Sequence, residues 1–279
     1  MTEHAEYIQQ LERCLIRTYR KRLWAKFIKA IAQYELIQDG DAIAVAISGG
    51  KDSLVLAKLF QYLHKYGKKN FSVKYMAMDP GYLPNHRKQL EDICAKMDIP
   101  VKIFNSDVFE VAEELNAENP CYLCARMRRG FLYGVARDLG CNKLALGHHM
   151  DDVIETTMMN IMCSASFHTM LPKLHAQNFP GMELIRPLYL IDEKDISAFM
   201  VANGLSSLDC ACSISANKQD GSKRAEIKNL IAKLEPDFDN LRKSIFKSTE
   251  NVEMAQILGW RDKEKRKHSF MDYYERSKE

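Results

Sequence analysis

Apolar residues recur at every fourth position in the first part of the chain. They are Leu11, Leu15, Tyr19, Leu23 and Phe27. Side chains spaced three or four residues apart lie on one side of an α-helix, so the pattern predicts a helix over residues 5–35 that buries this side. Gly40-Asp41 ends the pattern, because glycine and aspartate favour turns.

From residue 42 onward, short apolar runs alternate with segments of helical periodicity. The runs of strand length are 42–47, 71–78, 101–104, 143–146 and 184–187, and the helical segments are 54–66, 84–97, 127–139, 151–163 and 193–203. Strands separated by helices predict an α/β fold with a parallel twisted sheet, right-handed crossovers and helices on both faces. Such sheets bind ligands at the carboxyl ends of their strands, where we expect Gly49-Gly50, Asp79 and Gly147-His148 to gather.

After residue 212 the chain becomes polar and helix-prone, over 222–248 and 250–258, and it ends in a charged tail whose composition is compatible with disorder. We therefore divide the 279 residues into three parts. They are an N-terminal basic helical segment (1–38), an α/β domain (39–215) and a C-terminal helical extension with its tail (216–279).

Charge is concentrated near the N-terminus. The net charge is only +3, but residues 11–30 hold seven Lys or Arg against the single Glu12. A solvated helix face explains this cluster, and so does a surface that binds a polyanion such as nucleic acid. In the second case the candidate contacts are Arg17, Arg20, Lys21 and Arg22.

The eight cysteines bear on the compartment and the chemistry. Residues 1–10 are polar and acidic, unlike a secretion signal, and no stretch approaches the roughly 18 apolar residues that span a bilayer. We therefore expect a cytoplasmic protein without membrane association. In a reducing compartment, clustered cysteines indicate metal binding or catalysis rather than a disulfide framework.

A glycine pair follows the first predicted strand, in the stretch AVAISGGKDS (44–53). It is not a Walker A loop, because Val45 replaces the first glycine and Asp52 follows the lysine. A chance glycine turn is the simpler alternative. The strand–loop–helix context instead predicts an anion-binding loop, in which backbone N–H groups, the hydroxyls of Ser48 and Ser53, and the helix N-terminus face the anion.

A second group of candidates is Cys121-Tyr-Leu-Cys124, in a loop-like stretch after Pro120, with the distant pair Cys210-Ala-Cys212. Buried structural cysteines are the simplest explanation. A zinc site, a redox dithiol and an iron–sulfur cluster are the three functional ones, and the spacing alone does not choose among them.

The stretch Gly147-His-His-Met-Asp-Asp152 follows a predicted strand and opens a helix. Acidic residues there complement the helix dipole, and Asp151 needs no other role. His148 also fits as an ordinary core or loop histidine, and Arg128 as a solvated charge.

The hexapeptide SGGKDS resembles the loop of the PP-loop ATP pyrophosphatase family. Residues 119–155, which hold both the C-x-x-C and the Asp pair, resemble the branch of that family that thiolates tRNA. Residues 6–53 and the stretch IRPLYLIDEKDI (185–196) are most similar to members that make 2-thiocytidine. The uridine-thiolating sister group carries cysteine clusters at both ends, whereas this chain has no cysteine before Cys14 or after Cys212. The resemblance covers about residues 7–225.

The resemblance implies a Rossmann-like fold that cleaves ATP between its α and β phosphates and transfers AMP to a carbonyl oxygen. It also implies a [4Fe–4S] cluster with one open iron, held by Cys121, Cys124 and one later cysteine. Cys210 matches that ligand better than Cys212, although the C-x-C here is shorter than the family's C-x-x-C.

The resemblance also assigns the remaining site residues. The implied ATP-binding residues are Ala46, Ser48, Gly49, Gly50, Asp52, Ser53, Met78, Gly147 and His148. Asp52 would also hold Mg²⁺, and Asp152 and Arg128 would be catalytic. Apart from the resemblance, Arg186 precedes Pro187 at the end of the last predicted strand, where it could touch phosphate or tRNA.

The function implied is ATP- and cluster-dependent 2-thiolation of a tRNA base, most similar to that of cytidine in the anticodon loop, through an adenylated base with release of pyrophosphate. The implied partners are tRNA and a sulfur donor, either sulfide or a persulfide from a cysteine desulfurase. A zinc- or persulfide-type thiolase, a lysidine-type ligase and a non-catalytic iron–sulfur sensor that binds RNA stay open, as does a homodimer.

Overall fold

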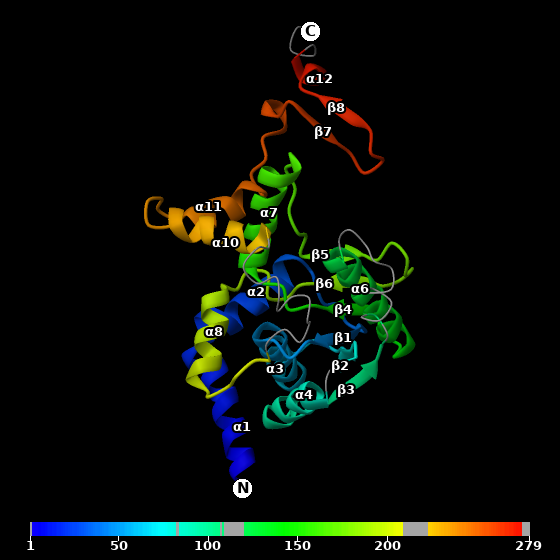
Figure 1. The fold of residues 1–279 in the computed structure, drawn as a ribbon, viewed down its shortest axis with the longest axis vertical. Helices are drawn as coiled ribbons and strands as arrows, with labels where there is room; N and C mark the ends of the chain where they lie inside the picture. Colours follow the sequence, from blue (N-terminus) through cyan, green and yellow to red (C-terminus); the bar gives the residue numbers. More distant parts are fainter. Residues whose placement is uncertain (1, 82–83, 107, 109–119, 209–222, 275–279) are drawn as a thin grey trace.

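The computed structural model describes residues 2–81, 84–106, 108, 120–208 and 223–274, and at 84, 120–125 and 273 the description is limited to the backbone. A six-stranded sheet lies at the centre of the molecule (Figure 1). Its strands are β1 (Ala42–Ile47), β2 (Ser72–Asp79), β3 (Val101–Asn105), β4 (Lys143–Ala145), β5 (Lys173–His175) and β6 (Glu183–Ile185). The helices between them are α3 (Lys51–Tyr66), α4 (Pro84–Lys96), α6 (Pro120–Asp138), α7 (Met150–Ser164) and α8 (Glu193–Ala202).

The strand order is β3-β2-β1-β4-β6-β5, and neighbouring strands are parallel except β5 and β6. The predicted α/β sheet is thus confirmed, but it has an antiparallel edge strand that the sequence analysis missed. β5 is three residues long and mixes Lys, Leu and His, so it has neither an apolar run nor a clear alternation. The last parallel strand also ends earlier than expected, at Ile185 rather than at residue 187.

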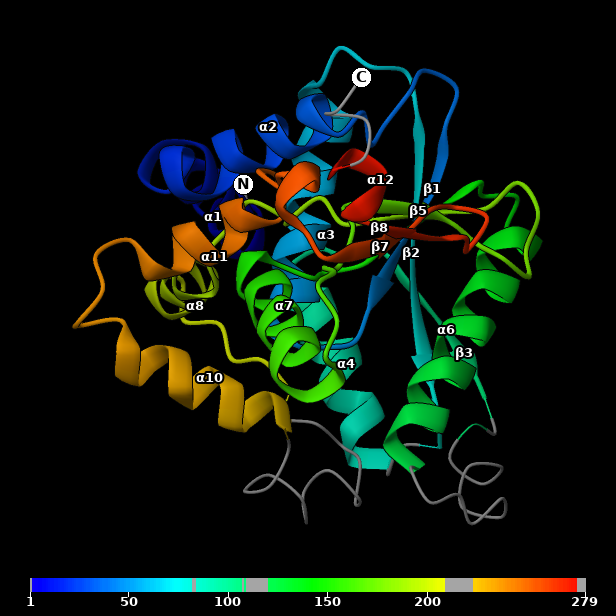
Figure 2. The same ribbon diagram turned by 90° about the horizontal axis from the view of Figure 1, so that it is seen from above.

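Helices cover both faces of the sheet, as predicted (Figure 2). Alternate residues of β1 face opposite sides: Ile43, Val45 and Ile47 enter one core, and Ala44 enters the other. The first core contains side chains of α3, α4, α8 and the N-terminal helices, and the second contains Tyr133 and Ala136 of α6. The N-terminal helices and α6 therefore lie on opposite faces.

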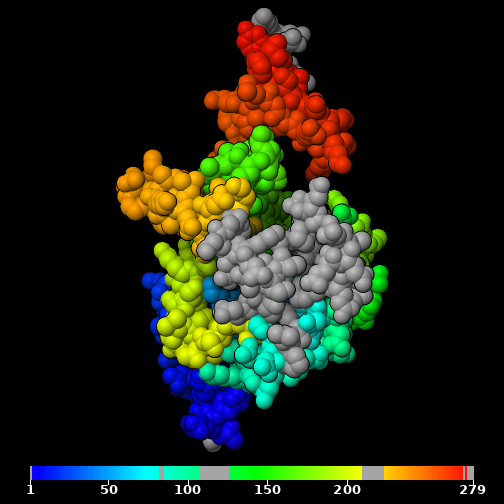
Figure 3. Space-filling view, viewed as in Figure 1, coloured from blue at the N-terminus to red at the C-terminus, as the bar shows by residue number. Residues whose placement is uncertain are grey.

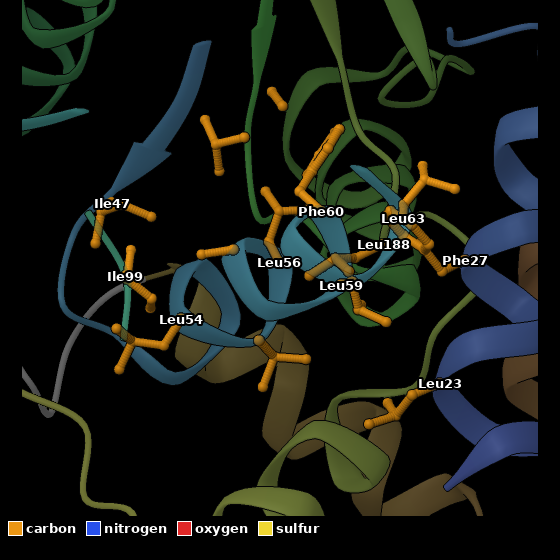
Figure 4. Packing of buried hydrophobic residues seen from close by; sticks show 14 of the residues in the cluster. Leu23, Phe27, Ile47, Leu54, Leu56, Leu59, Phe60, Leu63, Ile99 and Leu188 are labelled. Carbon is orange, nitrogen blue, oxygen red and sulfur yellow. The ribbon is translucent and has the colours of Figure 1, made fainter. Parts of the chain in front are cut away.

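The N-terminal segment is helical throughout but is not one regular helix. It consists of α1 (Glu3–Arg13), the π-helical turns η1 (Cys14–Thr18) and η2 (Arg20–Trp24), and α2 (Ala25–Gln33). A spacing of four residues exceeds the 3.6 residues of an α turn, and the wider π turns compensate for the difference. All five predicted apolar positions are consequently buried. Leu23 and Phe27 point toward Phe60 and Leu59 of α3 (Figure 4).

The C-terminal part differs from the expectation of long helices and a disordered tail. It forms α10 (Lys223–Leu234), α11 (Leu241–Ser248), the short 3₁₀ turn η3 (Met254–Gln256), an antiparallel hairpin of β7 (Gly259–Arg261) and β8 (Lys267–Ser269), and α12 (Met271–Tyr274). Residues 235–240 separate α10 from α11, and Asn240, directly before α11, adopts a left-handed conformation at φ 60°. Both helices pack on α7, and the hairpin projects from the body of the molecule (Figure 3).

α6 begins at Pro120, seven residues before the predicted start. The C-x-x-C is therefore in the first turns of a helix, not in a loop-like stretch. Proline at a first helical position explains the start, since its missing N–H needs no partner there. Among the helices that the structure describes, none is long and apolar enough to cross a membrane.

Candidate nucleotide site

A cavity of about 380 Å³ opens at the carboxyl ends of β1, β2 and β4. Nine of the residues singled out in the sequence line it: Ala46, Ser48, Asp52, Ser53, Met78, Arg128, Gly147, His148 and Asp152. The structure adds Ile47, Arg129, Leu132 and Leu146. Positions up to 106 residues apart in the sequence therefore meet in one place, as the strand ends predicted.

The glycine loop forms the turn from β1 into α3. Ser53 Oγ donates to the Gly50 carbonyl at 2.8 Å and accepts from the Ser48 N–H at 3.1 Å. The Ser53 hydroxyl hydrogen is thus committed to holding the loop, whereas the expectation was that it would face an anion. Ser48 and the N-terminus of α3 remain at the cavity.

Two positions require glycine because neighbouring atoms lie too close to the backbone for a side chain. Gly49 has φ +82°, and a Cβ there would lie 2.6 Å from Leu208 Cδ1. Gly147 packs directly on the first turn of α3, where a Cβ would be 3.1 Å from Ser53 N. Neither glycine can carry a side chain without a shift of its neighbours.

We expect Gly49→Ala to lower the free energy of unfolding by about 1–2 kcal/mol, because it adds a left-handed alanine and a clash with Leu208. Urea denaturation measures the change. Gly50→Ala is the matched control: Gly50 has φ −70°, and its added Cβ would meet only Ser48 Oγ at 3.4 Å. Equal stability of the two variants would contradict this account of the loop.

Asp52 offers an unused carboxylate oxygen at the cavity. Its Oδ2 accepts from Lys51 Nζ at 3.3 Å, while its buried Oδ1 has no hydrogen-bond partner among the described residues. Burial raises the pKa of Asp52, and the nearby His149 and Lys51 oppose that shift. A buried carboxylate oxygen without a donor is a fitting ligand for a divalent cation.

Lys51 does not point freely at the cavity. Its Nζ lies 3.0 Å from Glu193 Oε1, and Lys228 Nζ lies 2.6 Å from the other oxygen of Glu193. Burial alone would raise the pKa of Glu193, but the hydrogen bonds from Lys228 and Lys51 lower it to about 2. Glu193 therefore stays ionised and ties the glycine loop to α8 and α10.

The two histidines differ in their surroundings. Burial and the nearby Arg186 lower the pKa of His148 to about 4, so this cavity residue is neutral at pH 7. His149 is buried between the two acidic parts of the site, with Nε2 3.7 Å from Asp52 Oδ1 and Nδ1 3.5 Å from Asp152 Oδ2. Sequence reasoning missed His149, although its place beside His148 in the same motif was a usable signal.

The adjacent aspartates have separate roles. Asp152 lines the cavity; its Oδ2 accepts from the His149 N–H at 3.0 Å and its Oδ1 from Arg224 Nη1 at 3.1 Å. Asp151 is buried instead, accepts from the Glu193 N–H at 2.8 Å and pairs with Arg242. Asp151 thus has a structural role, but it contacts α8 and α11, whereas the sequence suggested only that it complements the dipole of its own helix.

Arg224 was not anticipated, because it comes from the C-terminal extension. Besides Asp152 it contacts Glu155 Oε2 at 3.1 Å and Thr156 Oγ1 at 3.3 Å. Burial raises the pKa of Glu155, and Arg224 counteracts that shift. α10 therefore holds the helix that carries Asp152.

Two further expectations differ from what the structure shows. Asp79 ends β2 but does not line the cavity: its carboxylate accepts from Arg87 Nη1 at 3.1 Å and from the Gly81 N–H at 3.1 Å. Arg186 is buried at 4% exposure and donates to the Leu171 carbonyl. It lies behind the cavity wall, too enclosed for direct contact with a tRNA surface.

The structure describes only some of the predicted cysteine ligands. Cys121 and Cys124 fall in the first turns of α6, the helix that brings Arg128 to the cavity. Cys210 and Cys212 lie outside the described residues. Leu208, two positions before Cys210 in sequence, donates its N–H to the Gly49 carbonyl at 3.0 Å. Within the described ranges, no three His, Cys, Asp or Glu side chains are arranged to hold a metal ion.

The basic N-terminal residues are at the surface. Arg17, Arg20, Lys21 and Arg22 are all exposed. Arg22 stacks over the Tyr19 ring at 4.3 Å and approaches Asp195 at 3.6 Å. These residues lie on the face of the sheet opposite to α6 (Figure 2).

The chain matches known proteins both in sequence and in fold. The family model of the PP-loop domain matches residues 19–234. The chain is 36% identical to a tRNA-cytidine(32) 2-sulfurtransferase of Syntrophotalea carbinolica over 82% of this chain and 88% of that protein. It is also 36% identical to one of Geotalea uraniireducens, over 84% and 93%.

A solved structure shares the fold. The U34-tRNA thiolase NcsA from Methanococcus maripaludis, with its [4Fe-4S] cluster, matches with a TM-score of 0.65 at 24% identity. The match covers 90% of this chain and 81% of that one.

Proposed function

The chain belongs to the PP-loop domain family, and from that premise we propose that it is a tRNA-cytidine 2-sulfurtransferase that activates its substrate with ATP. The observation that carries the proposal is the meeting of three motifs at one cavity. Ser48 and Asp52 come from the glycine loop, Asp152 from the start of α7, and Arg128 from the helix that begins with the C-x-x-C.

ATP would bind with its phosphates on the glycine loop. Backbone N–H groups at the N-terminus of α3 and the positive end of its dipole suit a polyphosphate. Arg128 supplies a cation from the opposite wall and has no ion pair within the described part of the chain. Met78 and Ala46 offer an apolar surface near the strand ends for the adenine base.

Asp52 is the proposed Mg²⁺ ligand, because it lines the cavity and its buried Oδ1 has no donor in the part of the chain that the structure describes. Magnesium uses few protein carboxylates and keeps phosphate oxygens as ligands. When bound, it would neutralise charge on the leaving pyrophosphate. His149 would hold the Asp52 carboxylate in place from the other side.

The proposed reaction has two steps. In the first, the C2 oxygen of the cytosine attacks the α phosphorus, the bond to the β-phosphate oxygen breaks, and pyrophosphate leaves. In the second, a sulfur nucleophile attacks C2, and AMP leaves with the former base oxygen. Asp152, fixed by Arg224 and the His149 N–H, would orient the reacting groups in the first step.

The sulfur half of the site rests on Cys121, Cys124 and Cys210, with Cys212 as the alternative third ligand. Cys121 and Cys124 belong to the same helix as Arg128, seven and four residues before it. Leu208, bonded to Gly49, brings the chain to the loop shortly before Cys210. A [4Fe–4S] cluster on these cysteines would bind the sulfur that replaces the base oxygen. The donor would be sulfide or a desulfurase-derived persulfide.

We further propose that residues 39–215 carry the chemistry and that segments 1–38 and 216–279 support substrate binding. In segment 1–38 the exposed Arg17, Arg20, Lys21 and Arg22 would contact tRNA phosphates at a salt-sensitive surface.

The test is mass spectrometry of tRNA nucleosides from the host with and without the gene. We expect loss of 2-thiocytidine on deletion, and its return with the wild-type gene. Purified protein, prepared without oxygen, should release pyrophosphate from ATP only when tRNA is present. No thionucleoside difference would reject the proposal, and a changed lysine-containing nucleoside would favour a lysidine-type ligase instead.

A further inference from the structure

A second cavity, of about 750 Å³, lies beside the nucleotide cavity. It is bounded by α6 on one side and by β5 and the residues that follow β5 on the other. Arg129 lines both cavities. A ligand in the second cavity would therefore be next to a nucleotide in the first.

The walls of this cavity carry positive and amide groups but no carboxylate. Arg126 and Arg129 come from α6, and His175, Gln177 and Asn178 come from the β5 side. Tyr133 and Phe179 form an apolar wall, with their rings stacked at 5.3 Å between centroids. Arginines for phosphate, amides for base edges and an aromatic wall are the groups that bind single-stranded RNA.

The polar groups here are not satisfied within the protein. Neither Arg126 nor Arg129 makes a hydrogen bond or ion pair with any residue that the structure describes. The buried Tyr133 hydroxyl, at a residue only 5% exposed, also lacks a partner in the described ranges. Burial, and after it the positive charge of the nearby Arg129, lower the pKa of Arg186 to about 10. Two exposed arginines that have no partner among the described residues suit an anionic ligand.

We infer that this cavity binds the tRNA nucleotide next to the modified one, with Arg126 and Arg129 on its phosphodiester and Gln177 and Asn178 at its base. The inference rests on the proposed function, since it needs the target base to enter the first cavity. It also places an RNA contact on the α6 face, opposite to the basic N-terminal residues. An anticodon loop suits this arrangement because its bases separate without opening a helix.

Binding of a fluorescent anticodon stem-loop RNA, measured at several salt concentrations, tests the inference. We expect Arg126→Gln to weaken RNA binding about five- to tenfold and to reduce the salt slope by about 0.7, which corresponds to one lost phosphate contact. The KM for ATP should change less than twofold. Lys88→Gln removes one exposed charge on α4 and serves as the control that should bind RNA like wild type.

The base contact has its own test. Asn178→Ala should weaken binding of the natural loop, but not of a loop in which the bound neighbour of the target base is abasic; both neighbours are tried. The inference is wrong if Arg126→Gln binds RNA like wild type, or if Lys88→Gln weakens it equally. If the wild-type protein thiolates tRNA in either of those cases, only the inference about this cavity is wrong and the proposed function stands. If the wild-type protein does not thiolate tRNA at all, the proposed function is wrong.

Discussion

Asp152→Asn should lower the rate of AMP transfer by about 100- to 10,000-fold, the range for losing a positioned acid–base group. The carboxylate lines the nucleotide cavity and accepts two hydrogen bonds, from the His149 N–H and from Arg224. An amide keeps the shape but loses the charge and one acceptor. Pyrophosphate release in the presence of tRNA measures the effect, and affinity for ATP should change little.

Asp151→Asn is the matched control, since it removes the same charge one position earlier. Asp151 holds α8 through the Glu193 N–H and α11 through Arg242, and it does not line the cavity. We expect this variant to unfold at lower denaturant but to keep most of its activity when folded. A similar kinetic loss in both variants would show that the Asp152 effect is structural.

Substitutions of Arg224 test whether Asp152 must be held in position by its hydrogen bond to this arginine. Arg224→Ala should reduce the turnover rate more than it raises the KM for ATP, and Arg224→Lys should restore part of it. Lys223, its exposed neighbour paired with Glu226, should tolerate replacement by alanine.

Local patterns were sufficient to predict the centre of the fold. The apolar run 42–47 predicted the bounds of β1, and the glycine pair predicted the loop that follows it. The histidine at a strand end predicted the start of α7 to within one residue. These features depend on neighbouring residues alone, so the sequence reveals them. The same reasoning brought Asp52 and Asp152 to one cavity because parallel strands share one carboxyl edge.

Long-range contacts were beyond that reasoning. Arg224 and Arg242 reach the Asp pair from a C-terminal extension that looks merely polar in sequence, and the docking of Leu208 on Gly49 joins distant segments. The prediction that Asp79 lies at the cavity was wrong, because its carboxylate pairs instead with Arg87, eight positions later. Ion pairs of this kind leave no periodic signal, since any exposed charge in a sequence could be the partner.

Cys121→Ser should abolish formation of the thionucleoside while leaving tRNA-dependent pyrophosphate release within about threefold of wild type. In the proposed mechanism, AMP transfer depends on the glycine loop, Asp52, Asp152 and Arg128, whereas the cysteine pair would act only in sulfur transfer. Cys121→Ser leaves all of these nucleotide-site residues in place, so the first half-reaction should survive. Serine keeps the size of the side chain but is a poor ligand for iron. Nucleoside mass spectrometry and a pyrophosphate assay on the same preparation measure the two steps separately.

Cys163→Ser provides the control, because Cys163 is an exposed free cysteine on α7 and does not line the nucleotide cavity. It should retain both steps. Cys210→Ser and Cys212→Ser then identify the third ligand: we expect Cys210→Ser to behave like Cys121→Ser and Cys212→Ser to keep thiolation. Full thionucleoside formation by Cys121→Ser would exclude the cysteine pair from sulfur transfer. Loss of pyrophosphate release in the same variant would mean that AMP transfer also requires an intact cysteine site on α6, so the two steps could not be separated.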